Sequence, residues 1–403
     1  MNGPRAATWL LWAGPAFVLA WVLGFLLTPE VRGLAEPQDF AGLAGLAALA
    51  AIAWCAWRAL DRRGLLTVFD EARHRAPAQF GLSVLLCAAV FPLILAQLGK
   101  YYWIHVGALS LIYVILAVGL NLVVGFAGLL VIGFAAFYGI GAYAAAIVTT
   151  EVGDLPHMIW LLIPAAAVLS AAFGVLLGVP TLRLRGDYLA IVTLGFGEIT
   201  RIVFTNWDTL TRGPRGISGV GSFQIGGWNL MHPLDVGPLR LDGDTQYYYL
   251  ILAAALLGVF LAHRLNHSRI GRAWVAMRED ELAARSFGID VARCKILAFA
   301  IGAAYAGVAG VFFGSLQGFV DPTSFSFLES VLILSMVVLG GMGSLSGSVV
   351  AAVLLVILPE KLQMLRDYRM LIFGLLMILL MIVRPQGLIP SRRRMLELGS
   401  RPG

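Results

Sequence analysis

The segment RIGRAWVAMREDELAARSFGIDVARCK, residues 269–295, is the longest charged interruption between apolar segments in the second half of the chain. Within it, the run Arg278–Glu281 precedes Leu282, Ala283 and Phe287, apolar residues with helical spacing. Acidic residues suit the first turn of a helix, and Gly288 is placed where helices commonly end. The pattern predicts a short amphipathic helix between the two flanking apolar segments.

The composition is typical of a membrane protein. Of 403 residues, 59% are hydrophobic and 13% are charged, whereas soluble domains carry about 45–50% apolar and about 25% charged residues. Apolar runs of about 17–25 residues recur along nearly the whole chain, and the 46 glycines suit closely packed membrane helices. The sequence therefore predicts an all-α polytopic protein that crosses the lipid bilayer. Between two such spans, residues 269–295 are either an ordinary solvated loop or a docking helix that carries force from a separate motor.

Apolar runs predict about twelve transmembrane helices. We expect them at residues 9–27, 41–57, 80–98, 105–121, 132–149, 158–180, 188–206, 247–263, 295–314, 328–342, 345–358 and 370–384. Residues 1–35 also resemble a signal peptide, but the length of the first apolar run favours a retained span. The regions 121–134 and 340–347 are each compatible with a broken or a re-entrant helix.

The basic residues predict the orientation of these helices. Of the 29 Lys and Arg residues, twenty fall in segments on one side, eight on the other, and Arg201 within a span. Since basic loops stay in the cytoplasm, both termini are expected there. The same distribution accounts for the net charge of +6, so it does not indicate binding to nucleic acid.

Three parts are expected along the chain. The polar stretch 58–78 separates a two-helix membrane extension, residues 1–78, from a compact helical core, residues 79–390. A short basic tail, residues 391–403, follows and is interpreted as a topology anchor.

No catalytic or nucleotide-binding motif is present in the sequence. A Walker A loop requires Gly-Lys-Ser/Thr, and the only Gly-Lys pair, Gly99-Lys100, lacks the following Ser or Thr. The three cysteines, Cys55, Cys87 and Cys294, do not have the spacing of metal ligands. We expect no enzyme activity, no metal and no cofactor on this chain. If ATP drives it, another chain binds the ATP.

Two glycine-rich stretches differ in their spacing. In residues 302–314 a small residue recurs at every fourth position, which favours close packing between helices. In residues 119–143, GLNLVVGFAGLLVIGFAAFYGIGAY, the glycines are too dense for packing alone and accompany Asn121. Broken helices that line a solute path use such stretches, so packing and a path are both open interpretations there.

Charged residues inside predicted spans are further candidates. Glu198 and Arg201 lie three residues apart on one helix face, where they can pair. Because each charge costs about 2.5–3.5 kcal/mol at the centre of a membrane helix, the pair should face the bundle interior or the outer interface. A helix-locking ion pair is slightly favoured over a role in a path, and Glu329 has the same two interpretations.

Residues 207–246 form the longest segment predicted on the outer side. They contain Arg212 and Arg215 within RGPRGI, together with Trp207 and Trp228. A disordered linker would be more polar and would lack these tryptophans. We expect an ordered surface that can receive an external partner.

Five stretches resemble one family, the LivM-type permease subunits of branched-chain amino acid ABC importers. They are LRLRGDYLAIVTLGFGEITRI (182–202), GRAWVAMREDELAARSFGI (271–289), LQGFVDPTSFSF (316–327), VVLGGMGS (337–344) and RPQGL (384–388). The resemblance covers roughly residues 80–390, and it is weaker in the first two spans.

The resemblance implies an importer of the bacterial inner membrane that is made of several chains. A second, LivH-type permease subunit would accompany this one, two ATP-binding subunits would use ATP at the cytoplasmic side, and a periplasmic binding protein would deliver hydrophobic amino acids. The fold would join a core of about ten helices, as in ribose-type ABC importers, to two N-terminal helices. Urea and amide importers have similar permeases, so these solutes are an alternative.

The resemblance, together with the residue patterns above, predicts three groups of functional residues. The coupling helix that docks on an ATP-binding subunit would include Arg278, Glu279, Asp280, Glu281, Ala284 and Gly288. The translocation path would involve Asn121, Gly125, Gly128, Gly133, Gly195, Gly197, Glu198 and Arg201. The binding protein would dock at Arg212 and Arg215, although Arg215 takes a position that is often uncharged in the family.

An ion-coupled secondary transporter is the alternative from another class. It would need acidic residues near the middle of the membrane, and Glu198 and Glu329 are the available candidates. A membrane enzyme is a third class, but no nucleophile, base or metal cluster supports it.

Overall fold

The computed structural model describes residues 77–151, 158–182, 184, 186–225, 228–236, 239–361, 374 and 387–388. The chain divides into two compact units, Met1–Trp103 and Ile104–Gly403. In the first unit the described elements are α4 (Pro77–Gln97) and the start of α5 (Tyr101–Asn121).

Several predictions fall on other parts of the chain. The expected spans at 9–27 and 41–57, the tail 391–403 and, apart from residue 374, the span at 370–384 lie outside the described residues. The domain boundaries proposed at residues 78 and 390 stay predictions.

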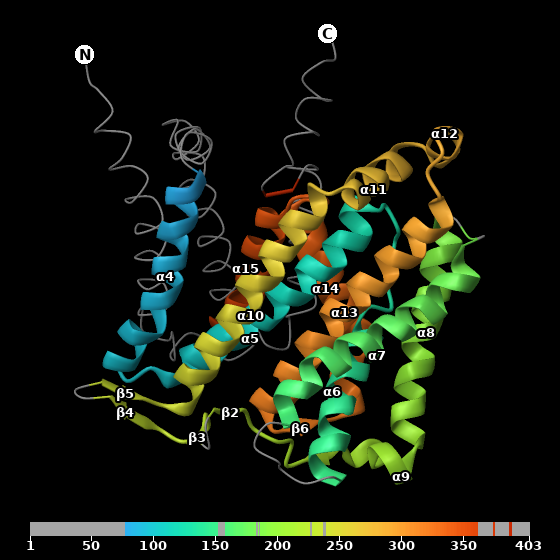
Figure 1. The fold of residues 1–403 in the computed structure, drawn as a ribbon. Helices are drawn as coiled ribbons and strands as arrows, with labels where there is room; N and C mark the ends of the chain where they lie inside the picture. The colour runs from blue at the N-terminus through green and yellow to red at the C-terminus, as the bar shows by residue number, and fades with distance from the viewer. Residues whose placement is uncertain are drawn as a thin grey trace, which may run out of the picture. The chain divides into compact units, whose positions relative to one another are not determined.

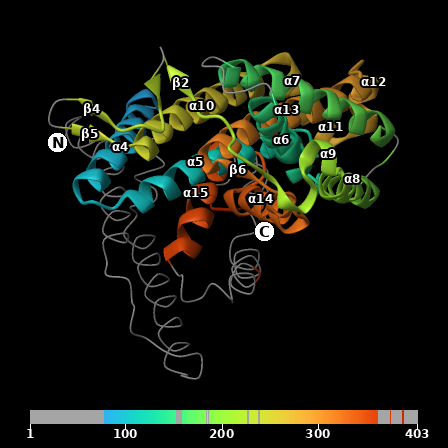
Figure 2. The same cartoon turned by 90° about the horizontal axis from the view of Figure 1, so that it is seen from below.

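The second unit is centred on α13 (Val291–Gln317). This helix packs most extensively against α7 (Met158–Thr181) and α6 (Ala135–Glu151). The three helices lie side by side in two perpendicular views (Figures 1 and 2). Helix α13 lies in the interior of the unit, since Ala298, Ala306 and other small residues of it are fully buried.

The small residues predicted to pack helices closely do so. Gly302 of α13 meets Val123, and Gly310 meets the backbone of α6 at Tyr138. A Cβ atom at either glycine would overlap these neighbours. The repeated small residues of 302–314 therefore form a packing face, as predicted.

Every span predicted between residues 80 and 358 corresponds to a helix. The remaining long helices are α8 (Asp187–Asn206), α10 (Gly243–Asn266), α11 (Arg269–Glu279), α14 (Phe327–Gly340) and α15 (Leu345–Lys361). Among the described residues, five helical segments are long and apolar enough to cross a membrane: Tyr101–Phe126, α7, α8, α10 and α13. The full count of twelve spans stays a prediction.

Helices α14 and α15 are shorter than a typical span. The 14 residues of α14 extend about 21 Å, against about 30 Å for a hydrocarbon core. The two helices pack on each other through a tight turn in which Gly341 and Gly343 have φ of 106° and 84°. Gly340 touches the backbone at Gly347, so a Cβ there would overlap it. Region 340–347 is thus a compact turn between two short helices.

Segments predicted on opposite sides of the membrane lie at opposite ends of the second unit. Helices α11 and α12 (Glu281–Ser286) lie at one end, and the strands lie at the other (Figure 1). The strands and short helices of that end are α9 (Asp208–Thr211), η2 (Gly213–Arg215), β1 (Ile217–Ser218), β2 (Gln224–Ile225), β3 (Trp228–Asn229), β4 (Leu234–Val236), β5 (Leu239–Leu241), β6 (Phe319–Val320) and η3 (Pro322–Phe325). The arrangement agrees with a unit that crosses a membrane.

The outer segment is ordered, as predicted, where the structure describes it. Strand β1 pairs antiparallel with β6, and β2–β3 and β4–β5 form two further antiparallel pairs. These short strands were not expected in an all-α protein. Strand β6 follows α13, so the β1–β6 pair fastens the outer segment to the central helix.

Candidate functional site

Helix α5 does not continue into α6. Its end is a π-helix, η1 (Leu122–Phe126), and residues 127–134 then have no regular helical structure. Helix α6 begins at Ala135. Of the forms left open for region 121–134, the structure has a broken helix, and π-helical turns are frequent at functional sites.

Side chains of two other helices replace the hydrogen bonds that the break removes. The Ile132 amide donates to Thr193 Oγ1 of α8 over 3.1 Å, and the Ala135 amide donates to Ser330 Oγ of α14 over 3.0 Å. Irregular backbone at membrane depth is tolerated where protein buries it or where it lines a cavity. The break is therefore held between α8 and α14.

Three predicted path glycines lie at this crossing or beside it. Gly133 lies directly against the carbonyl of Thr193, and a Cβ on Gly197 would come 3.0 Å from the Gly133 Cα. These two glycines let the broken segment touch α8 backbone to backbone. Gly195 has no neighbour within 4 Å of a built Cβ, so its face of α8 is open in this chain.

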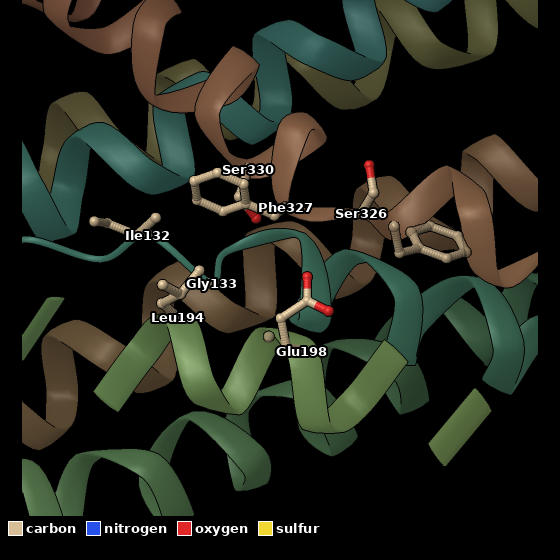
Figure 3. A pocket seen from close by; sticks show the side chains of 9 residues that line it. Ile132, Gly133, Leu194, Glu198, Ser326, Phe327 and Ser330 are labelled. Carbon is tan, nitrogen blue, oxygen red and sulfur yellow. The ribbon is translucent and has the colours of Figure 1, made fainter. Parts of the chain in front are cut away.

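A small pocket lies where the broken segment, α8 and α14 meet (Figure 3). It is a shallow, partly open hollow that leaves room for about one water molecule in this conformation. Its lining residues are Ile132, Gly133, Leu194, Gly197, Glu198, Phe325, Ser326, Phe327 and Ser330. Glu198 is eleven residues from the start of α8, about 16 Å along a helix of about 30 Å. The pocket is therefore close to the middle of this span.

Glu198 is the charged residue in the pocket lining, and it pairs with Arg201, which lies outside the lining. Glu198 Oε2 accepts a hydrogen bond from Arg201 Nε over 2.9 Å, so the predicted ion pair is confirmed. Both side chains are 36% exposed in this chain. Helices α6 and α14 begin beside the pocket at Ala135 and Phe327, and the amino ends of helices carry partial positive charge. A zwitterion would find a carboxylate and the positive end of α6 here, whereas Glu329 in the first turn of α14 offsets the positive end of that helix.

The short helix predicted between the two spans exists but starts later than expected. Arg278 and Glu279 belong to α11, and Asp280 adopts an extended conformation that separates this helix from α12. The Asp280 carboxylate accepts hydrogen bonds from the Leu282 and Ala283 amides over 2.8 and 3.0 Å, which makes it the N-cap. The continuous helical pattern across 278–287 concealed this change of direction.

The end of α12 agrees with the prediction. The helix stops at Ser286, and Gly288 has φ of 79°, a left-handed conformation that glycine adopts readily. Ala284 is buried against the rest of the unit, whereas Leu282 is 63% and Phe287 is 87% exposed. Two large apolar side chains therefore project from a helix outside the predicted membrane spans.

Glu281 has a structural partner that the sequence did not reveal. Lys295 Nζ lies 3.2 Å from both carboxylate oxygens of Glu281, and the Lys295 side chain is only 5% exposed. Arg285 also contacts Glu281, over 2.7 Å. The pair ties the first turn of α12 to the start of α13. The sequence offered one sign of this pair: Lys295 directly precedes a long apolar run, where a buried lysine needs an acidic partner.

Predicted coupling and path residues meet at the end of α5. The Arg278 guanidinium donates a hydrogen bond to the Gly125 carbonyl in η1, and Gly128 lies against the Arg278 side-chain stem. The Gly343 amide donates to Asn121 Oδ1 over 2.8 Å. Residues assigned to two separate groups from the sequence thus form one cluster.

The two predicted docking arginines lie at the opposite end. Arg212 has φ of 57° and is the N-cap residue before η2, and Arg215 ends η2; both are exposed. Thr211 Oγ1 fixes the preceding turn by donating to the Phe204 and Trp207 carbonyls. Exposed Trp207 lies in the same segment. This surface combines positive charge with aromatic area.

Metal chemistry finds no support in the described part of the chain. No group of three or more His, Cys, Asp or Glu residues that could hold a metal ion occurs there.

The chain matches known transport proteins over most of its length. The family model "Branched-chain amino acid transport system / permease component" matches residues 102–381. The high-affinity branched-chain amino acid transport system permease protein LivM of Salmonella typhimurium is 45% identical over 335 residues, which cover 80% of this chain and 77% of the relative. LivM of Escherichia coli is 44% identical over 333 residues, covering 79% and 76%.

A second permease type is more distantly similar. LivH of Escherichia coli, a permease protein of the same kind of system, is 27% identical over 285 residues, covering 69% of this chain and 91% of LivH. No solved structure matches the chain. The family match and the identity to LivM confirm the resemblance seen in the sequence: the chain belongs to the permease components of branched-chain amino acid transport systems.

Proposed function

We propose that this chain is the LivM-type permease subunit of an ATP-driven importer of branched-chain amino acids. The observation that carries the proposal is the 45% identity to LivM over four-fifths of the chain. The broken helix and the exposed docking helix support it, because an importer needs a solute path and a contact with its motor.

The proposed path runs past the pocket at the break. Substrate sites of many transporters lie near the middle of the membrane, where the ends of interrupted helices face the solute. Here Glu198 would attract the ammonium group of an amino acid, and the amino end of α6 would favour its carboxylate. Leu194, Phe325 and Phe327 supply apolar surface for an aliphatic side chain.

The proposed motor consists of two ATP-binding subunits that hydrolyse ATP, and this chain itself binds no nucleotide. An ATP-binding subunit would cover Leu282 of α12 and Phe287, the C-cap of this helix, which together present a small apolar surface. Burying a phenylalanine side chain stabilises a contact by about 1.5–3 kcal/mol.

Two further partners complete the proposed importer. A LivH-type permease would cover the open face of α8, because a half-exposed ion pair such as Glu198–Arg201 is costly against lipid. A periplasmic binding protein would dock near Arg212 and Arg215. With these partners on their respective sides, the chain would lie in a bacterial inner membrane with both termini in the cytoplasm.

The proposed cycle is one of alternating access. A loaded binding protein docks at the outer end, ATP closes the motor, and α12 moves the helices so that the pocket changes side. The binding protein sets the specificity, so the pocket needs only weak affinity of its own.

Purification of the tagged chain from cells that express its native neighbours tests this assembly. We expect a second polytopic permease and Walker A proteins to copurify in mild detergent. Recovery of the chain alone or as a homodimer would contradict the proposal. Competition of labelled leucine uptake by excess isoleucine, valine, urea or amides then identifies the solute, and competition by urea alone would exclude a branched-chain substrate.

A further inference from the structure

Three segments far apart in the sequence converge at the inner end of α5. They are the π-helix η1, the junction of α11 with α12, and the turn between α14 and α15. Arg278, Asn121 and Gly343 make the contacts that join them. The convergence lies between the proposed motor contact and the proposed path.

Arg278 faces the break as well as the surface. It is two residues before Asp280, the N-cap of α12, so a displacement of α12 acts on it directly. Its guanidinium donates to the Gly125 carbonyl, and a Cβ on Gly128 would come 2.7 Å from Arg278 Cγ. Gly125 lies in η1, at the carboxyl end of the helical segment that begins with α5. The carboxyl end of a helix carries partial negative charge, which suits the positive charge of an arginine.

The same cluster includes the turn between α14 and α15. Asn121 is fully buried, and its Oδ1 accepts from the Gly343 amide. A Cβ on Gly343 would come 3.4 Å from Arg278 Nη1. Two segments connect the cluster to the pocket. The broken segment runs from Gly125 in the cluster to Gly133 in the pocket lining. Helix α14 joins the turn at Gly340 to Ser330 in the lining.

One polar atom of the cluster lacks a hydrogen-bond partner among the described residues. Asn121 Nδ2 is buried and has no hydrogen-bond partner among the described residues. A buried donor without a partner is unfavourable, so a rearrangement that gives it one would be stabilising. A π-helical turn next to this amide provides backbone that can change its hydrogen bonding.

We infer that Arg278 is a positioning residue that transmits the movement of α12 to the broken helix, through Gly125, and thereby controls access to the pocket. This inference rests on the proposed function. It differs from an assignment of Arg278 to the motor-facing surface, because its hydrogen bond is made within the permease. The effect of losing it should fall on the coupling between ATP hydrolysis and transport, while the motor stays bound.

The test compares Arg278→Gln with Arg272→Gln in the complete importer reconstituted in liposomes. Arg272 lies on the same helix, is exposed and donates to the His267 carbonyl over 3.0 Å, so it is a matched arginine outside the cluster. Three quantities are measured: recovery of the ATP-binding subunits, ATP hydrolysis stimulated by loaded binding protein, and leucine uptake.

For Arg278→Gln we expect normal recovery of the motor and nearly unchanged ATP hydrolysis. The leucine transported per ATP should fall about 5- to 150-fold, the usual range of coupling between distant sites. Arg272→Gln should match the unmodified chain. Equal coupling in both variants, or a parallel fall of motor recovery, hydrolysis and uptake in Arg278→Gln, would overturn the inference.

A second variant decides the case in which Arg278→Gln fails to assemble. Asn121→Ala removes the acceptor for Gly343 at a buried position that no motor can touch, and we expect the same loss of leucine per ATP. Loss of assembly in both variants would assign the cluster a structural role only and overturn the inference. If the unmodified complex transports no leucine, the proposed function itself fails, which separates the two outcomes.

Discussion

The ion pair between α12 and α13 and the ion pair at the pocket differ in burial. Glu281 and Lys295 have 18% and 5% of their side chains exposed and join α12 to α13 at the end of a span. Glu198 and Arg201 are each 36% exposed, although they lie midway along α8. The buried pair is a structural fastening, whereas a half-exposed pair inside a span requires water or a partner beside it.

Glu281→Lys should break the fastening and have the largest effect on stability. It places a second positive charge beside buried Lys295, and breaking a buried pair costs about 3–5 kcal/mol. The thermal unfolding midpoint in detergent should fall strongly. The double change Glu281→Leu with Lys295→Met serves as control and should restore it, because apolar replacements of buried pairs are often neutral. An unchanged midpoint in Glu281→Lys alone would show that the pair fastens nothing.

Gly133→Ala should damage the pocket through packing rather than charge. Its Cβ would overlap the Thr193 carbonyl, and overpacking of this kind costs about 1–3 kcal/mol. Gly195→Ala is the matched control on α8, since it has open space and should not lower the stability of the isolated chain. Equal midpoints for the two variants would contradict the close crossing of the break and α8.

The sequence predicted the features that depend on neighbouring residues and missed those that depend on residues far apart in the chain. Apolar runs identified every described span, because run length depends on neighbouring residues alone. The start of α12 was misplaced by the helical pattern, since the capping geometry of Asp280 is not visible in periodicity. Glu198 and Arg201 were paired correctly at a separation of three residues. Arg278 and Gly125 are 153 residues apart, and no pattern in one sequence connects them.

Glu198→Gln should leave stability nearly unchanged but impair transport. A half-exposed pair contributes less than about 1 kcal/mol to the free energy of unfolding. Loss of an ammonium contact of about 1.4 kcal/mol would weaken solute binding about tenfold. Leucine uptake at limiting concentration measures this effect, and Glu151→Gln, an exposed change at the end of α6, is the control. Uptake equal to that of the control would remove Glu198 from the path.

Phe287→Ser should have the smallest effect on the chain itself. The residue is 87% exposed, and substitutions at such positions usually change the free energy of unfolding by less than about 0.5 kcal/mol. Recovery of the ATP-binding subunits should nevertheless fall, because the apolar contact is lost. Ser286→Ala, the exposed neighbour, is the control, and full recovery of the motor with Phe287→Ser would place the docking surface elsewhere.

Leucine uptake by the reconstituted importer, with and without ATP on the motor side, tests the central claim most directly. We predict uptake that requires loaded binding protein and ATP and does not respond to an imposed proton or sodium gradient. Uptake by this chain without ATP, driven by an ion gradient, would contradict the account and identify a secondary transporter.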